Sequence, residues 1–279
     1  MQEATRVPGT VPGPRGMAID LTPLLNDWAH DPSDEGKNVR CIRGADGRLK
    51  IQVRVRCGIF QWEFEGRPDG ATPHGFPSVL DFYRAHLKSQ ERRSGSRSLR
   101  LGKAEIEEIS EEITDYYQRR ILFFRLGEYA RAREDADHNV GLMDLIRDHA
   151  ADPEVVAQHE KWRGFALMDR ARADALALCQ SGHYAQAVQR VDQGIAEIED
   201  WFRRQERADV IPVSQELAAL RELKLQLRET YNVPLSRKEL IEGLREEQAK
   251  AIADEDYERA ARLRDEIAQF ERDEGQRTT

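Results

Sequence analysis

The strongest constraint on this chain's fold is a helical spacing of hydrophobic residues that runs from about residue 103 to the end of the sequence. Spacings of three and four residues place apolar side chains on one face of each helix. Glycine and proline end helices, because glycine adopts positive φ angles without strain and proline lacks a backbone N–H. The pattern therefore predicts about seven helical segments over the last two thirds of the chain. They are separated at Gly127, Pro153, Gly182, Pro212 and Pro234.

The pattern changes to strict alternation in the segments Val39–Arg43, Leu49–Cys57 and Phe60–Glu65. Alternation with a period of two is typical of half-buried strands, and the intervening Asp46-Gly47 is a common hairpin turn. A helix that begins after the N-cap residue Ser78 follows and is expected to cover the sheet. The N-terminal part is therefore predicted to be a small antiparallel β-meander with a helix.

Charged residues on the outer face of this sheet have the spacing of cross-strand partners. Arg54 and Arg56 are expected to pair with Glu63 and Glu65. The loop from Arg67 to His74 is one place where polar groups of this domain could gather around a small ligand. Forming a turn is the simpler interpretation of that loop.

The charge of the chain argues against a broad electrostatic grip on nucleic acid, since the formal net charge is −8. Residues 17–102 are nevertheless mildly basic, with 14 basic and 11 acidic side chains, whereas residues 103–233 have 18 and 26. A nucleic-acid-binding accessory role of the N-terminal domain and the following linker is therefore the alternative function. It would depend on Arg54, Arg56, Arg92, Arg93, Arg97 and Arg100.

Signatures of catalysis, metal binding and membrane insertion are missing from the sequence. The seven histidines are scattered, and Cys41, Cys57 and Cys179 have no C-x-x-C spacing. Paired carboxylates such as Glu107-Glu108 and Glu111-Glu112 are expected on a solvated helix face. No apolar run reaches the roughly 18 residues of a membrane span. We expect a cytoplasmic protein that is not an enzyme, with no catalytic residues, cofactor or metal.

A short pattern, Gly-x-Tyr-x-x-Ala, occurs at Gly127-Glu128-Tyr129 and again at Gly182-His183-Tyr184. In each copy the glycine can end one helix, the tyrosine can pack back across the turn, and the alanine allows close approach of the next helix. The arrangement resembles the helical hairpins of tetratricopeptide repeats, which implies a surface for binding proteins. An ordinary helical bundle with similar turns is the other interpretation.

The C-terminal segment begins with Ser236 and Glu239, which have the spacing of a capping box. Asp254-Glu255-Asp256 is expected to end this helix and to cap the next. The second helix reads Asp256-Tyr257-Glu258-Arg259-Ala260-Ala261-Arg262-Leu263-Arg264-Asp265-Glu266-Ile267.

This second helix resembles the UVR motif, which occurs in the excision-repair proteins UvrB and UvrC, in protein arginine kinase activators and in Clp-type chaperones. The resemblance implies a bacterial protein with a two-helix antiparallel hairpin that binds another UVR protein or a second copy of itself. A hairpin this short buries little apolar surface, so its apolar stripe is expected to need a partner chain or the preceding helix. The expected interaction residues are Leu240, Leu244, Tyr257, Glu258, Ala260, Ala261, Leu263, Arg264, Asp265 and Ile267.

Together these patterns predict an α+β fold that is mostly α. The expected function is a non-enzymatic adaptor, linked to nucleotide excision repair or to Clp-type proteolysis and the stress response. Nucleic acid would be contacted indirectly, and Met17 is the expected native start. The expected organisation is a disordered tail (1–16), a small α+β domain (17–88), a linker (89–102), a tetratricopeptide-like helical domain (103–233), the UVR hairpin (234–274) and a disordered end (275–279).

Overall fold

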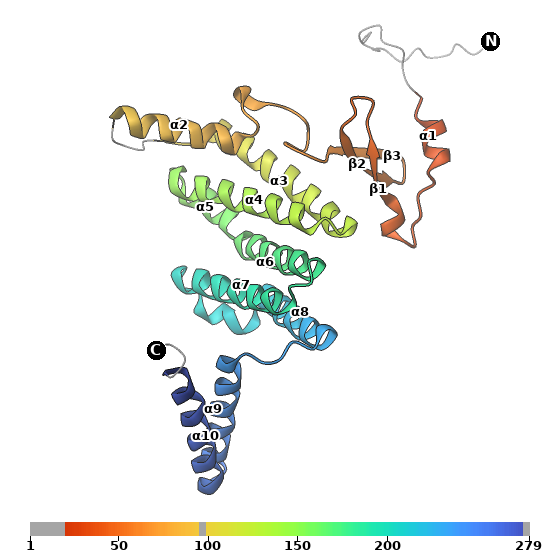
Figure 1. Ribbon diagram of the computed structural model, residues 1–279. Coiled ribbons are helices and arrows are strands. Elements are labelled where there is room, and N and C mark those ends of the chain that lie inside the picture. The colour runs from red at the N-terminus through yellow and green to blue at the C-terminus, as the bar shows by residue number, and fades with distance from the viewer. Residues whose placement is uncertain (1–19, 95–98, 276–279) are drawn as a thin grey trace, which may run out of the picture. The chain divides into compact units, whose positions relative to one another are not determined.

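A computed structural model describes residues 20–94 and 99–275, and over these residues the chain is predominantly helical (Figure 1). The predicted tail 1–16, the proposed start at Met17 and the last four residues lie outside the described residues. The described part divides into two compact units, with Ala173 the last residue of the first and Asp174 the first of the second. The predicted fold class, mostly α with a small N-terminal sheet, is confirmed.

The first unit opens with a short helix and the predicted β-meander. Strands β1, β2 and β3 pair in sequence order as an antiparallel sheet. Lys50 pairs with Glu63 in the β2–β3 register, whereas Arg54 lies opposite Ile59. The expected Arg54 and Arg56 pairs with Glu63 and Glu65 are therefore wrong, because the register places Lys50 beside Glu63. The elements of this segment are α1 (Thr22–Asp27), the 3-10 helix η1 (Glu35–Asn38), β1 (Val39–Arg43), β2 (Leu49–Val55) and β3 (Gly58–Glu63).

The rest of the first unit is helical, and two clusters of its buried residues fix how the helices are packed. One cluster joins the sheet to helix α3, because Ile51 and Phe64 pack against Leu122 and Phe123. The elements are the 3-10 helix η2 (Pro73–Gly75), α2 (Val79–Ser94), α3 (Lys103–Leu126), α4 (Tyr129–His149), α5 (Pro153–Glu160) and α6 (Arg163–Gln180), of which α6 continues into the second unit.

Helix α2 packs on α3 and α4 and not on the sheet. Its buried residues Val79 and Leu80 belong to a cluster with Ile109, Leu142 and Ile146 of those two helices. The expectation that this helix covers the sheet is therefore wrong, and α3 takes that position. The helix also extends to Ser94, so the first part of the expected linker 89–102 is helical.

The second unit contains the end of α6, α7 (Tyr184–Arg204), the 3-10 helix η3 (Ala208–Val213), α8 (Gln215–Tyr231), α9 (Arg237–Ala253) and α10 (Tyr257–Gly275). Helices α7 and α8 pack together, and Ile198 and Phe202 on α7 and Leu217 and Leu220 on α8 are buried. Helices α9 and α10 form an antiparallel hairpin of their own (Figure 1).

The two Gly-x-Tyr-x-x-Ala segments form the turns that the sequence predicts. Gly127 and Gly182 have φ angles of 73° and 76°, in the left-handed region that favours glycine. Ala132 and Ala187, the last residues of the two patterns, are fully buried. The roles predicted for the glycine and the alanine are therefore confirmed at both turns, whereas Tyr184 is exposed and stacks on Tyr231 of α8.

Candidate protein-interaction site

The C-terminal hairpin begins with the predicted capping box. The backbone N–H of Ser236 donates to Glu239 Oε2 at 2.9 Å, and the backbone N–H of Glu239 donates to Ser236 Oγ at 3.4 Å. These bonds satisfy two of the amide groups that the first turn of a helix leaves without a partner. The start of α9 is therefore fixed by its own sequence.

The same carboxylate ties α9 to the preceding helix α8. Glu239 forms ion pairs with Lys224 and Arg228. Burial alone would raise the pKa of Glu239, but hydrogen bonds from Lys224, Ser236 and Arg228 lower that pKa to about 2. The base of the hairpin is thus held by a charged carboxylate at neutral pH.

The turn between α9 and α10 follows the predicted acidic segment. Glu255 adopts a φ of 60°, and the backbone N–H of Asp256 donates to the carbonyl of Ala251 at 2.8 Å. The side chain of Asp256 then accepts a hydrogen bond from the backbone N–H of Arg259 at 3.0 Å, which caps α10. Gln248 also donates across the hairpin to the carbonyl of Ala260 at 3.3 Å.

The interior of the hairpin is small and comes from α9 and α10 themselves. Ala251, Ala260 and Leu263 are buried together, with Leu244 packed against them. Ile267 is also buried, at 7% exposure. The expectation that the apolar stripe needs a partner chain or the preceding helix is therefore wrong for Ala251, Ala260 and Leu263, because the small alanines let α9 and α10 approach and cover these residues themselves.

The side chains that remain for a partner lie on a different face of α10. Tyr257, Glu258, Ala261, Arg264 and Asp265 are all exposed. Their spacing of one, three, three and one residues places them on one side of the helix, which we call the outer face of α10. Tyr257 carries the largest apolar surface there, with 68% of the residue exposed.

The tip of the hairpin adds a second apolar side chain, since Ile252 is 52% exposed at the end of α9. Near the base Leu235 is 53% exposed. Exposed aromatic and aliphatic side chains on a short hairpin are typical anchors for a protein partner.

The ten predicted interaction residues thus fall into three groups by burial. Arg264 and Asp265 pair with each other, with Nη2 of Arg264 2.8 Å from Oδ1 of Asp265, and both side chains are exposed. Such a pair contributes little to the stability of the hairpin, so its charges are available to a partner. Ala260, Leu263 and Ile267 are interior, Leu240 and Leu244 are half-buried, and Tyr257, Glu258, Ala261, Arg264 and Asp265 form the outer face.

Comparison with known families agrees with this geometry. Residues 238–273 match the family model of the UvrB/uvrC motif (UVR), and this range covers nearly all of α9 and α10. The chain is therefore a UVR-motif-containing protein, with the match confined to its C-terminal hairpin. No curated protein and no solved structure matches the chain. The tetratricopeptide-like character of residues 103–233 stays a prediction.

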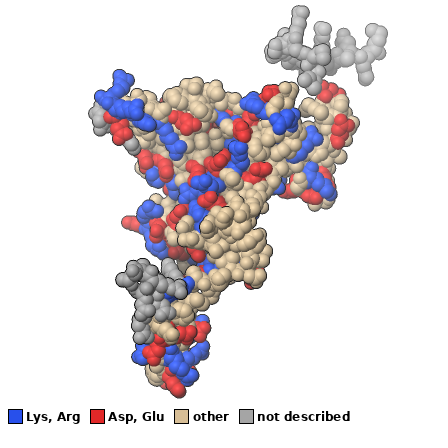
Figure 2. Space-filling view, in the orientation of Figure 1, with Lys and Arg blue, Asp and Glu red and all other residues tan. Residues whose placement is uncertain are grey.

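Of the basic residues on which the alternative hypothesis depends, Arg54 is not on the surface. Arg54 is buried at 6% exposure, and its guanidinium donates to the carbonyls of Trp28 at 2.6 Å and Gly58 at 3.1 Å. Arg92 and Arg93 lie in the last turn of α2, where cations suit the helix dipole. Arg56 and Arg100 are exposed on other segments, and Arg97 lies outside the described residues. In the view of Figure 2, basic residues lie among acidic ones, and large areas carry neither.

The loop from Arg67 to His74 is used for packing and pairing. Nε of Arg67 lies 3.0 Å from Oδ1 of Asp69, and its Nη1 lies 3.3 Å from Oε2 of Glu112. His74 stacks on Phe82, with ring centroids 4.2 Å apart. Its Nε2 also lies 2.9 Å from Oε1 of Glu108. The polar groups proposed for a ligand are thus bound to neighbouring residues, which favours the turn-forming interpretation.

Glu112 is buried, although the sequence pattern predicts that it lies on a solvated helix face. It is fully buried, and it accepts hydrogen bonds from the backbone N–H groups of Val79 at 2.8 Å and Leu80 at 3.2 Å. Burial raises the pKa of Glu112, but bonds from His138 and from these two amides outweigh it and lower that pKa overall. The expectation of a solvated face is wrong here, since Glu112 holds the N-terminus of α2.

Over 20–94 and 99–275, no three histidine, cysteine, aspartate or glutamate side chains lie close enough to hold one metal ion. Within the same ranges no helix is both long and apolar enough to cross a membrane.

Proposed function

We propose that this protein is a non-enzymatic adaptor that binds partner proteins through its UVR hairpin. The observation that carries the proposal is the separation of the two faces of α10. The hairpin closes its own small interior, while the outer face of α10 keeps Tyr257 at 68% exposure. Tyrosine side chains surrounded by polar groups are frequent hot spots of protein interfaces.

The partner that fits this surface is another helical hairpin. The outer face of α10 combines one aromatic ring, the small Ala261 and the adjacent charges of Arg264 and Asp265. A small residue lets a second helix come close, and paired charges of both signs can re-pair across an interface and fix its register. We propose a UVR hairpin of another protein or of a second copy as the partner, in excision repair or in Clp-type proteolysis under stress, in the cytoplasm.

The experiment is a quantitative pull-down from native lysate with three full-length baits. Ala261→Arg places a long charged side chain in the middle of the outer face of α10. Ala219→Arg makes the same change at an exposed position of α8 and is the matched control. The proposal predicts partners that bind the wild-type chain and the control and are lost with Ala261→Arg.

Light scattering on the purified chains separates a foreign partner from a second copy. If the partner is a second copy, the wild-type chain and Ala219→Arg form a dimer, and Ala261→Arg is a monomer. The adaptor proposal fails if both variants retain the same partners and the same mass as the wild-type chain.

A further inference from the structure

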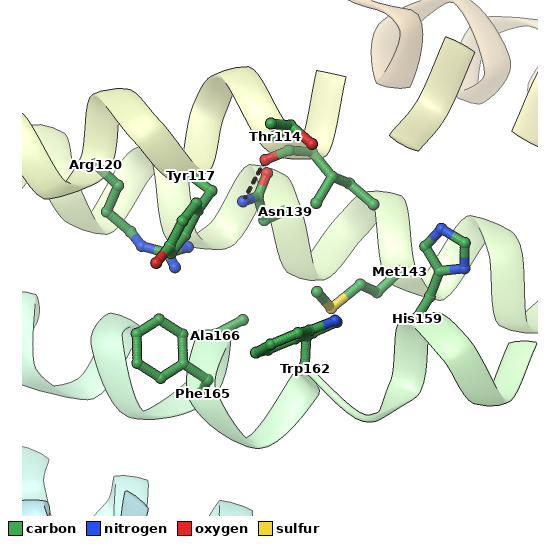
Figure 3. A pocket seen from close by; sticks show the side chains of 10 residues that line it. Thr114, Tyr117, Arg120, Asn139, Met143, His159, Trp162, Phe165 and Ala166 are labelled. Carbon is green, nitrogen blue, oxygen red and sulfur yellow. Dashed lines mark hydrogen bonds between the residues drawn. The ribbon is translucent and has the colours of Figure 1, made fainter. Parts of the chain in front are cut away.

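A cavity of about 420 Å³ lies inside the first unit, between α3, α4, α5 and the start of α6 (Figure 3). Its walls are mostly apolar and include the rings of Tyr117, Trp162 and Phe165 and the thioether of Met143. The rings of Tyr117 and Phe165 meet edge to face across it, with centroids 6.0 Å apart. Pockets for small molecules typically have volumes of about 300–1,000 Å³ and walls of this kind.

Three buried polar atoms in this wall have no hydrogen-bond partner among the described residues, and two of them also lack an ion pair, since Nε of Arg120 lies 3.0 Å from Oδ2 of Asp169. One of these two is Oδ1 of Asn139, a residue that is 1% exposed. The orientation of this amide is fixed, because its Nδ2 donates to the carbonyl of Ile113 at 3.1 Å. The other is Nη1 of Arg120, a residue that is also 1% exposed.

Buried polar atoms without partners are rare in folded proteins, and in a cavity wall they indicate where a ligand makes its hydrogen bonds. Nη1 of Arg120 is a donor and needs an acceptor, such as a carbonyl oxygen. Oδ1 of Asn139 is an acceptor and needs an N–H. Two other polar side chains of the cavity already have partners. Thr114 Oγ1 donates to the carbonyl of Ser110 at 2.9 Å, and His159 uses both ring nitrogens, on Val155 O at 2.8 Å and on Ser110 Oγ at 2.9 Å.

The charge around Arg120 favours an uncharged ligand. Oδ2 of Asp169 lies 3.0 Å from Nε of Arg120, so the guanidinium already has its counter-ion. A second buried carboxylate, Asp135, is paired with Arg119. An anionic ligand would enter beside these two carboxylates without a free cation to balance it.

We propose that this cavity binds a small, uncharged aromatic compound that carries a carbonyl and an N–H group. The ring of the compound lies among Tyr117, Trp162 and Phe165, its carbonyl accepts from Arg120, and its N–H donates to Asn139. Trp162 is 58% exposed and stands at the mouth, so it is the side chain that a ligand covers on entry.

Nuclear magnetic resonance of the full-length chain with ¹³C-labelled methionine methyl groups tests this inference. Met143 lines the cavity, whereas Met168 is buried outside its lining and serves as the internal reference. The Met143 signal is assigned from its loss in Met143→Leu. The probes are benzamide, benzoate of the same shape with a negative charge, toluene without polar groups, and N-acetyl-phenylalanine amide as a peptide mimic.

We expect benzamide to shift the Met143 signal with a dissociation constant on the order of millimolar. Benzoate and toluene should bind roughly ten-fold more weakly, because they fail to satisfy one or both of the buried polar atoms. Trp162→Ala should weaken benzamide binding at least about three-fold. Phe60→Ala, at a residue with the same 58% exposure outside the cavity, should leave it unchanged.

Several results would overturn the inference. Toluene or benzoate binding as tightly as benzamide would show that the two polar atoms do not select the ligand. Tighter binding of the peptide mimic would assign the cavity to a side chain of a partner protein. The absence of any Met143 shift with benzamide at concentrations on the order of 20 mM would show that the cavity takes no such compound.

Discussion

Replacement of Glu112 by glutamine should destabilise the first unit strongly, although the change removes only a charge and one acceptor atom. The two carboxylate oxygens of Glu112 accept from Val79 N–H and Leu80 N–H and lie 2.8 Å from His138 Nε2 and 3.3 Å from Arg67 Nη1. Glutamine keeps one oxygen and turns an N–H₂ group toward a backbone N–H that is itself a donor. At least one hydrogen bond and the ion pair with Arg67 are therefore lost at a fully buried position.

The expected magnitude follows from these contacts. A hydrogen bond to a charged group contributes about 1.5–3 kcal/mol, and a buried partner left unpaired adds its own desolvation cost. We expect the free energy of unfolding of the first unit to fall by about 3–5 kcal/mol in Glu112→Gln. The matched control is Glu111→Gln, because Glu111 is the preceding residue on α3 and is exposed. This control should change the free energy of unfolding by less than about 0.5 kcal/mol.

Hydrogen exchange measured at single residues is the assay, because a chain with two compact units need not unfold in one step. In Glu112→Gln the amides of α2 should exchange at least roughly 100-fold faster, while those of α8 keep their rates. Equal exchange of the α2 amides in the two variants would refute the reasoning, since it would mean that Glu112 does not hold this helix.

Two further predictions concern local features. The pKa of Glu239 is lowered to about 2 from the usual 4.5. A lowered pKa means that the carboxylate stabilises the folded state above pH 4.5 and that this contribution, about 1–2 kcal/mol, is lost as the pH falls toward 2. Hydrogen exchange at the start of α9 should therefore accelerate over this pH range in the wild-type chain, and a Glu239→Gln chain with the same dependence would contradict the assignment. Gly182→Ala should lower the free energy of unfolding in urea by about 1 kcal/mol, because φ is 76° at an otherwise open position. Gly243 also has open space around it but lies inside helix α9, so Gly243→Ala should raise the free energy of unfolding by about 0.5–1 kcal/mol. A change of the same sign in both glycine variants would contradict this reasoning.

Features set by neighbouring residues were predictable from the sequence. The capping box at Ser236 and Glu239, the acidic turn before Tyr257 and the glycine turn at Gly127 all depend on residues within a few positions of one another. The strands of the meander also follow from alternation and from one hairpin turn. For this reason the fold class and the hairpin that carries the UVR motif could be inferred before any coordinates.

Features set by distant residues were not predictable in this way. Glu112 looks like one of several helix-surface glutamates, and its partners Val79 and Leu80 lie 33 and 32 positions away in the chain. Arg54 looks like an outward strand residue, but the carbonyl of Trp28 lies 26 positions before it. Helical spacing also could not separate the buried Leu263 from the exposed Tyr257, because that division depends on how α9 covers α10.

The polar atoms of the cavity had no sequence signal either. Asn139 and Arg120 lie on two different helices, and nothing in the sequence around either residue distinguishes it from other helical residues. Their lack of partners becomes visible only once the side chains around them are placed. The sequence also did not predict that Trp162 is exposed, since an aromatic residue in a helical segment is more often part of the core.

The central claim is that the outer face of α10 contacts a partner protein, and site-specific photo-crosslinking tests it most directly. A benzoyl-phenylalanine in place of Tyr257 keeps an aromatic side chain on this face and leaves Ala261 small. In the full-length chain it reports what lies against the outer face of α10 in native lysate, and the same group at position 219 on α8 is the control. We predict a discrete crosslinked protein, either foreign or a second copy, from position 257 and none from position 219. Equal products from both positions, or none from 257, would contradict the claim.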